Sequence, residues 1–183
     1  MKFAIKMCAL LLMLATATAF TADQEKTDLT KMRDQIRVLE SVLNQNLTQS
    51  FPGPFPYLDA AHGVYLPGYG VVFSFEVNLA RPSAGLFDAP STQTDRERKQ
   101  EEQRRREQAK ALAQKVIADF GHTLDQLGAD DSLAIVIHGS AVTERGLEKT
   151  TIVVRAQKRD LDQFRANTLD RAAFLRKLQV LEY

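Results

Sequence analysis

The chain has almost no cysteine, since its 183 residues include one, Cys8, and no tryptophan. Cys8 lies at the start of the apolar run of the first residues, too early for a lipid-modified cysteine, and it lacks the small residues that precede one. Cys8 falls within a predicted signal peptide at residues 1–19, and the chain without these residues has no cysteine at all. This excludes disulfides, a thiol nucleophile and a cysteine metal site. It also favours a bacterial envelope protein, because secreted eukaryotic domains of this size more often carry disulfides.

Long apolar runs and a net charge of either sign are also missing. The apolar run at 7–14 is far shorter than the roughly 20 residues that a membrane-spanning helix needs, and no second run of that kind follows. The 24 basic and 23 acidic residues nearly cancel. The arginines at 104–106 are interleaved with glutamates and have no aromatic neighbours for base stacking. We therefore expect neither a transmembrane segment nor a nucleic-acid partner.

The first residues have the pattern of an export signal. Lys2 and Lys6 form a basic start, the apolar run follows, and Ala17 and Ala19 have the small-x-small spacing that signal peptidase recognises. The pattern predicts a signal peptide over residues 1–19, cleaved after Ala19. The protein is then expected in the periplasm or outside the cell.

A helix is predicted over residues 20–50, followed by a proline-rich linker at 51–62. Apolar side chains recur within this helix at steps of 3, 4, 3 and 4, a narrow heptad seam of the kind found in coiled coils. Such a seam packs against one other helix, either of the same domain or of a second chain. The second alternative makes the seam a candidate contact site for another copy or for an envelope partner. Its residues are Leu29, Met32, Ile36, Leu39 and Leu43.

Residues 63–183 predict one α+β domain with a small, mostly antiparallel sheet covered by helices. Alternation indicates a half-buried strand or hairpin near 63–79 and a half-buried strand near 149–156, and the apolar run near 132–139 indicates an interior strand. A helix over 95–127 is charged and exposed in its first half and apolar on one face in its second half. Two short helices, capped by Asp160 and Thr168, are expected to close the chain.

The glycines at Gly68 and Gly70 raise the possibility of a phosphate-binding loop. Such a loop needs glycines between a strand and the first turn of a helix, so that amides and helix dipole meet the anion. Here the glycines precede a strand, which argues against a nucleotide. We expect them to shape the strand, with Gly68 at a bend and Gly70 in a bulge.

No catalytic, cofactor-binding or metal-binding residue is predicted. Asp125, Asp130 and Asp131, with His138, are the best candidates for an alternative function as a secreted metal-dependent hydrolase. A second alternative is a peripheral membrane-surface protein that uses aromatic side chains in its loops. Those side chains are Phe51, Phe55, Tyr57 and Phe87. The favoured hypothesis is an exported protein that works by protein–protein contact and needs no cofactor.

Overall fold

The structure is a computed structural model that describes residues 27–51, 59–79, 94–143 and 146–183, with backbone alone for 141–148. The predicted signal peptide at 1–19 lies outside these ranges, as does most of the proline-rich segment. The helix predicted over 20–50 is described from its N-cap onward as α2 (Leu29–Ser50). Asp28 caps it, because its carboxylate accepts hydrogen bonds from the backbone N–H groups of Thr30 at 2.9 Å and Lys31 at 3.1 Å.

The described strands form a five-stranded sheet in the order β1 (Asp59–Leu66), β2 (Gly70–Asn78), β3 (Ser132–Thr143), β4 (Gly146–Gln157) and β5 (Gln179–Glu182). The predicted α+β class is confirmed. The sheet is mixed: β2 and β3 are parallel, whereas the pairs β1–β2, β3–β4 and β4–β5 are antiparallel. The parallel pairing follows from the connection between β2 and β3. This connection contains a helix, which returns the chain to the end of the sheet where β2 began, so that β3 runs in the same direction.

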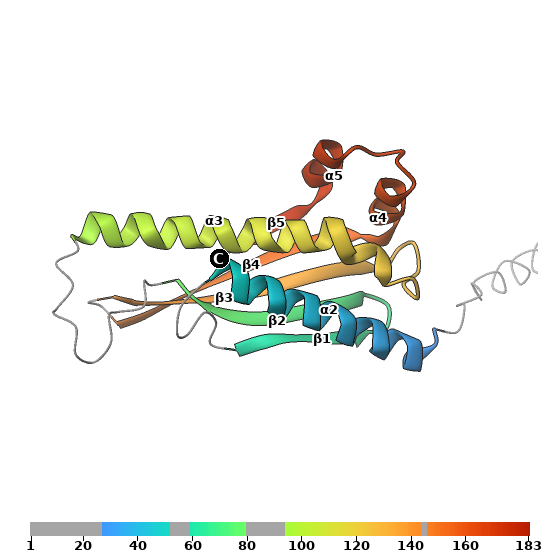
Figure 1. Cartoon of the computed structure of the whole chain (residues 1–183), viewed down its shortest axis with the longest axis horizontal. Helices are drawn as coiled ribbons and strands as arrows, with labels where there is room; N and C mark the ends of the chain where they lie inside the picture. Colours follow the sequence, from blue (N-terminus) through green and yellow to red (C-terminus); the bar gives the residue numbers. More distant parts are fainter. Residues whose placement is uncertain (1–26, 52–58, 80–93, 144–145) are drawn as a thin grey trace, which may run out of the picture.

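Two long helices pack on one face of this sheet. In Figure 1, α2 crosses in front of β1 and β2, and α3 (Asp95–Phe120) runs along the other half of the sheet. The inward side chains of β2, β3 and β4 join both helices in one apolar core. Helix α3 ends at Phe120, before the predicted end at 127, because a 3₁₀ turn, η1 (Gly121–Thr123), follows it. The buried residues of α3 begin only at Ala109.

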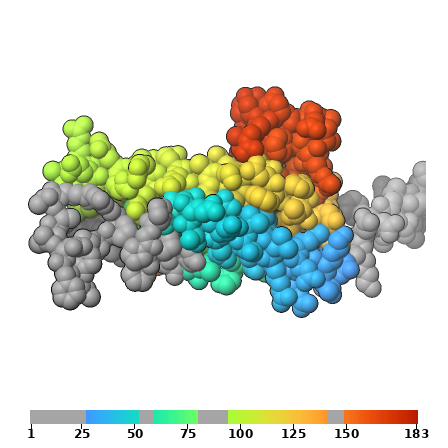
Figure 2. Space-filling model, viewed as in Figure 1, coloured from blue at the N-terminus to red at the C-terminus, as the bar shows by residue number. Residues whose placement is uncertain are grey.

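The last part of the chain forms two short helices and the fifth strand. Helices α4 (Lys158–Arg165) and α5 (Arg171–Lys177) pack through Phe164 and Phe174, whose rings stack with centroids 4.8 Å apart. They form the red lobe beyond α3 in Figure 2. Two predicted caps were misplaced, because Asp160 lies inside α4 and Asp170 caps α5 in place of Thr168.

Of the strand or hairpin predicted over 63–79, the structure shows the hairpin: Gly68 lies in the turn between β1 and β2, and Gly70 is the first residue of β2. The bulge predicted at Gly70 is wrong, because Gly70 pairs in register with Leu66 and the irregularity of this strand pair lies between Asp59 and His62. Gly68 has a φ of +77° and Gly70 a φ of +123°, both in the region that favours glycine. A Cβ on Gly70 would lie 2.0 Å from the carbonyl oxygen of Ser132. Gly70 is therefore required both by its backbone angle and by its close approach to β3.

Candidate contact surface

The predicted seam on α2 faces the chain's own core. Met32, Ile36, Leu39 and Leu43 are at most 7% exposed, whereas Leu29 is 65% exposed. The packing is close, because a Cβ on Gly63 of β1 would lie 2.6 Å from Cγ2 of Ile36. The structure thus places four of the five candidate contact residues inside the monomer, mainly against the sheet. Only Leu29 is left on the surface.

Polar side chains of α2 also fasten the helix to the edge strand β1. The carboxylate of Glu40 accepts a hydrogen bond from the N–H of Gly63 at 2.7 Å, and the side-chain oxygen of Asn44 accepts one from the N–H of Ala61 at 2.8 Å. Glu40 and Asn44 are one turn apart, which matches the spacing of alternate residues along a strand. These N–H groups are therefore occupied by α2 and are not free to pair with another strand.

A third polar contact joins α2 to the turn before β3. Asp125 accepts hydrogen bonds from Gln35 and from Lys31, the latter at 3.0 Å. These bonds, Gln35 first and Lys31 second, lower the pKa of the Asp125 carboxyl to about 2. Asp125 therefore serves the docking of α2 and is not paired with Asp130 or Asp131 as the hydrolase alternative required.

The opposite face of the sheet is uncovered by any described helix, and we call it the open face. Side chains alternate along a strand, so the buried residues of β2, β3 and β4 leave their neighbours on this second face. Leu66 at 42%, Val64 at 51% and Leu181 at 60% are exposed on the outer strands, while the valines on the inner strands are half-buried. The apolar residues of the open face are Val64, Leu66, Val72, Ala134, Val136, Val153 and Leu181.

The apolar residues of the open face are contiguous across the strands. Val72 of β2 is paired with Val64 of β1 on one side and with Ala134 of β3 on the other. One row further along the strands, Val136 is paired with Val153, which is paired in turn with Leu181. Cross-strand neighbours of this kind touch. The open face therefore presents a continuous apolar centre, in which the valines of β2, β3 and β4 are half-buried and Ala134 is buried at 1% exposed.

Two of the charged side chains on the open face are held in place by their own neighbours, and a third, Lys149, is exposed beside Ser140. Arg155 donates two hydrogen bonds to the hydroxyl of Ser132, at 2.8 and 3.0 Å, and its guanidinium carbon lies 5.3 Å from the centroid of the Tyr69 ring. Glu76 accepts a hydrogen bond from the hydroxyl of Ser140. Arg155 and Glu76 therefore each have a fixed direction and retain hydrogen-bonding capacity.

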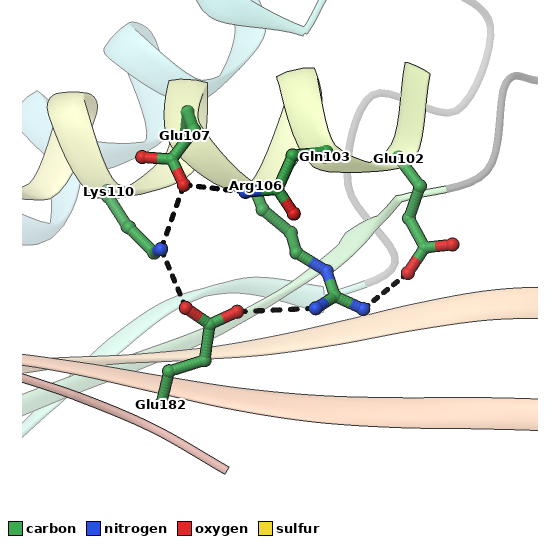
Figure 3. A network of polar contacts seen from close by, with 6 residues as sticks. All are labelled: Glu102, Gln103, Arg106, Glu107, Lys110 and Glu182. Atoms are coloured by element: carbon green, nitrogen blue, oxygen red, sulfur yellow. Dashed lines mark hydrogen bonds and ion pairs between the residues drawn. The ribbon is translucent and has the colours of Figure 1, made fainter. Parts of the chain in front are cut away.

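The strand β5 is attached to α3 by a network of ion pairs, shown in Figure 3. The Glu182 carboxylate accepts from Lys110 at 2.6 Å and from Arg106 at 3.3 Å, and Arg106 also pairs with Glu102. The hydrogen bond with Glu182 raises the pKa of Lys110, and the same bond lowers the pKa of Glu182. Sequence reasoning missed this network because β5, at four residues, is too short to show a strand period.

The residues proposed for a hydrolase are not brought together. Asp131 precedes β3, where its carboxylate accepts a hydrogen bond from the N–H of Gly128 at 2.9 Å. His138 lies seven residues further on, roughly 20 Å along the strand at the usual rise per residue, and its side chain is exposed on the open face. Within the described parts of the chain, no three His, Cys, Asp or Glu residues are grouped to hold a metal ion.

The membrane-surface alternative is tested at one residue. Phe51 is 3% exposed, so its ring belongs to the core and does not reach a bilayer. Phe55, Tyr57 and Phe87 lie outside the described residues. Among the helices that the structure describes, none has the length and apolar character to cross a membrane.

Comparison of the chain with models of protein families, with curated proteins and with solved structures found no match. The assignment of the open face as the candidate site therefore depends on the geometry of this chain alone.

Proposed function

We propose that this is an exported protein of the bacterial envelope that acts by protein–protein contact and not by catalysis, and that the open face is its contact surface. The observation that supports the proposal best is the continuous apolar centre of that face, which no described helix covers. The support for export remains the basic start, the short apolar run and the Ala-x-Ala spacing of the first residues. Relative to the sequence-based hypothesis, the contact moves from the seam of α2 to the sheet.

The open face is large enough for contact with another protein. Five strands about 4.8 Å apart, with about four outward side chains roughly 6.6 Å apart along each strand, cover on the order of 600 Å². The largest apolar patch on a typical monomer is about 300–600 Å² and is often functional. At those spacings each side chain occupies roughly 32 Å², so the seven apolar residues of the open face cover about 220 Å², somewhat below that range. Scattered apolar residues on a surface need no explanation, whereas these lie together on a face that no described helix covers.

The edges of the sheet are less suitable for contact than its face. On β1, Glu40 and Asn44 of α2 already occupy two outward N–H groups. On the opposite edge, β5 is only four residues long, and short edge strands are one means by which proteins avoid pairing with another chain. A partner is therefore expected to lie on the open face instead of extending the sheet.

A photoreactive residue placed at Val136 tests the proposal in living cells. A matched control carries it at Val38, which is 57% exposed but lies on α2, away from the open face. We expect irradiation to give a defined protein adduct from position 136 and none from position 38, with the adduct identified by mass spectrometry. If positions 136, 153 and 181 all give no adduct while the protein remains folded, the proposal is wrong.

A further inference from the structure

We infer that the partner on the open face is a second copy of this chain, packed sheet against sheet about a two-fold axis beside Val136. This inference depends on the proposed function and names the partner of that surface. It follows from where the two fixed charges lie, from the apolar centre between them and from the area available.

The charges lie on opposite sides of Val136. Arg155 is one strand away in the direction of β5 and is paired with Ala134, one row before Val136. Glu76 is one strand away in the direction of β1 and is paired with His138, one row after Val136. Val136 therefore lies midway between Arg155 and Glu76. When two copies face each other across a two-fold axis perpendicular to the line from Arg155 to Glu76, each arginine lies over the glutamate of the other copy.

The charge pairing is self-complementary, as a two-fold interface requires. One axis produces both Arg155–Glu76 pairs, on either side of the apolar centre. Asp59, the cross-strand partner of Glu76, extends the acidic side. Lys149, the cross-strand partner of Ser140, adds a positive charge one row beyond Glu76 and takes no part in the two proposed pairs. A partner with a different sequence has no reason to carry the same arrangement. The open face therefore matches its own copy in both charge and apolar character.

The side chains that would form these pairs are already oriented. Arg155 is held by Ser132 and by the Tyr69 ring, and Glu76 by Ser140. Binding then fixes few additional rotamers, which lowers the entropic cost of the interface. Sheets packed face to face lie about 10 Å apart, with interleaved side chains. Val136, Val153 and Leu181 have the size to fill that space.

The area of the interface determines the affinity expected for the dimer. About 600 Å² from each copy gives a total near 1,200 Å², the lower end of stable protein interfaces. Without residues 1–19, which include Lys2 and Lys6, the chain has 22 basic and 23 acidic residues, and this formal net charge of −1 gives little repulsion between copies. We therefore expect a reversible dimer with a dissociation constant in the micromolar range.

Sedimentation velocity of the purified protein from about 1 to 200 µM, a range that brackets a micromolar Kd, tests the inference. We expect the mass to rise from monomer to dimer. Val136→Glu should leave a monomer at every concentration, and Leu181→Glu provides a second variant at an exposed site that tolerates a charge. Val38→Glu, on α2, is the matched control and should dimerise normally. Circular dichroism confirms that each variant is folded.

Charge reversal distinguishes the proposed Arg155–Glu76 pairing from non-specific apolar association. Glu76→Arg and Arg155→Glu should each weaken dimerisation about tenfold or more, because like charges then face each other. The double variant Glu76→Arg/Arg155→Glu should return to within about threefold of the original affinity, since close charge pairs are coupled.

Two results would overturn the second-copy inference: a protein that stays monomeric throughout the range, or a double variant as weak as the single ones. The proposed function has a separate readout. If the crosslinker at Val136 captures a different protein while the chain is monomeric, the inference is wrong and the proposed function stands. If the crosslinker captures nothing at positions 136, 153 and 181 while the protein remains folded, the proposed function itself is wrong.

Discussion

Replacement of Leu43 by alanine tests whether α2 belongs to the folded core. Leu43 is 0% exposed and lies among apolar residues from the sheet and from both long helices. The substitution removes three carbon atoms from a site that solvent does not reach. Because the helix is also fixed to β1 by Glu40 and Asn44, it has little freedom to move into the space that is left.

The expected loss in the free energy of unfolding is about 2–5 kcal/mol, the range for a leucine replaced by alanine in a close-packed core. The upper half of that range is favoured, because the cost grows with the cavity that remains and the fixed helix limits its collapse. At roughly 2–4 °C per kcal/mol for a chain of this size, the midpoint of thermal unfolding should fall by about 4–20 °C.

Urea denaturation followed by circular dichroism measures this loss. The matched control is Val38→Ala on the same helix, where the valine is 57% exposed. Its effect should stay within about 0.5 kcal/mol, because alanine also has the better helix propensity. The slope of the free energy against urea should be unchanged in both variants, which confirms that the difference in midpoint reports stability.

A loss below about 1 kcal/mol for Leu43→Ala would contradict the reasoning. It would mean that α2 spends much of its time detached in solution, so that its seam is available to another chain as the heptad pattern first suggested. Equal losses in Leu43→Ala and Val38→Ala would point the same way, since burial would then not distinguish the two sides of the helix.

Three further predictions address other parts of the chain. Gly70→Ala should destabilise the protein by more than about 1 kcal/mol in urea denaturation, because the new Cβ would meet the Ser132 carbonyl and the backbone angle is strained; an unchanged midpoint would contradict this. Because folding lowers the pKa of Glu182, its ionised carboxylate stabilises the fold above the unfolded-state pKa of about 4.3. This stabilisation is lost as the pH falls through the folded-state pKa. Unfolding free energy should therefore decline less steeply below about pH 5 in Glu182→Gln than in the original protein, and parallel curves would rule out a role for the Lys110 ion pair. N-terminal sequencing of the exported protein should begin at Phe20, and an intact Met1 on a correctly exported protein would disprove cleavage.

The sequence predicted the α+β class and the inward residues of α2 and β2, because those patterns have a clear period over several turns or pairs. It did not predict what α2 packs against, since a heptad seam shows that a helix is covered but not by which surface. It left open whether 63–79 is one bent strand or a hairpin, because glycines such as Gly68 and Gly70 suit a bend as well as a complete turn.

The sequence did not predict the open face, and the reason lies in the composition of β3. The nearly continuous apolar run of β3 predicts a strand that is buried on both faces. In the structure β3 is indeed the central strand, but the described helices cover only one of its faces. A strand with one face in a protein contact and a strand buried on both faces within a domain have the same apolar composition. Only the arrangement of the helices distinguishes them.

The parallel pairing of β2 with β3 has a consequence for how the chain folds and unfolds. The pairs β1–β2 and β3–β4 are hairpins whose partners are close in sequence, whereas the β2–β3 pairing joins residues separated by the whole of α3. Contacts between distant residues form slowly, because the intervening chain must first be closed into a loop. We expect the two hairpins to form early and the boundary between them late, so that the molecule unfolds first along this line. Val136 lies on it, and a partner spanning the open face would bridge both halves and slow their separation.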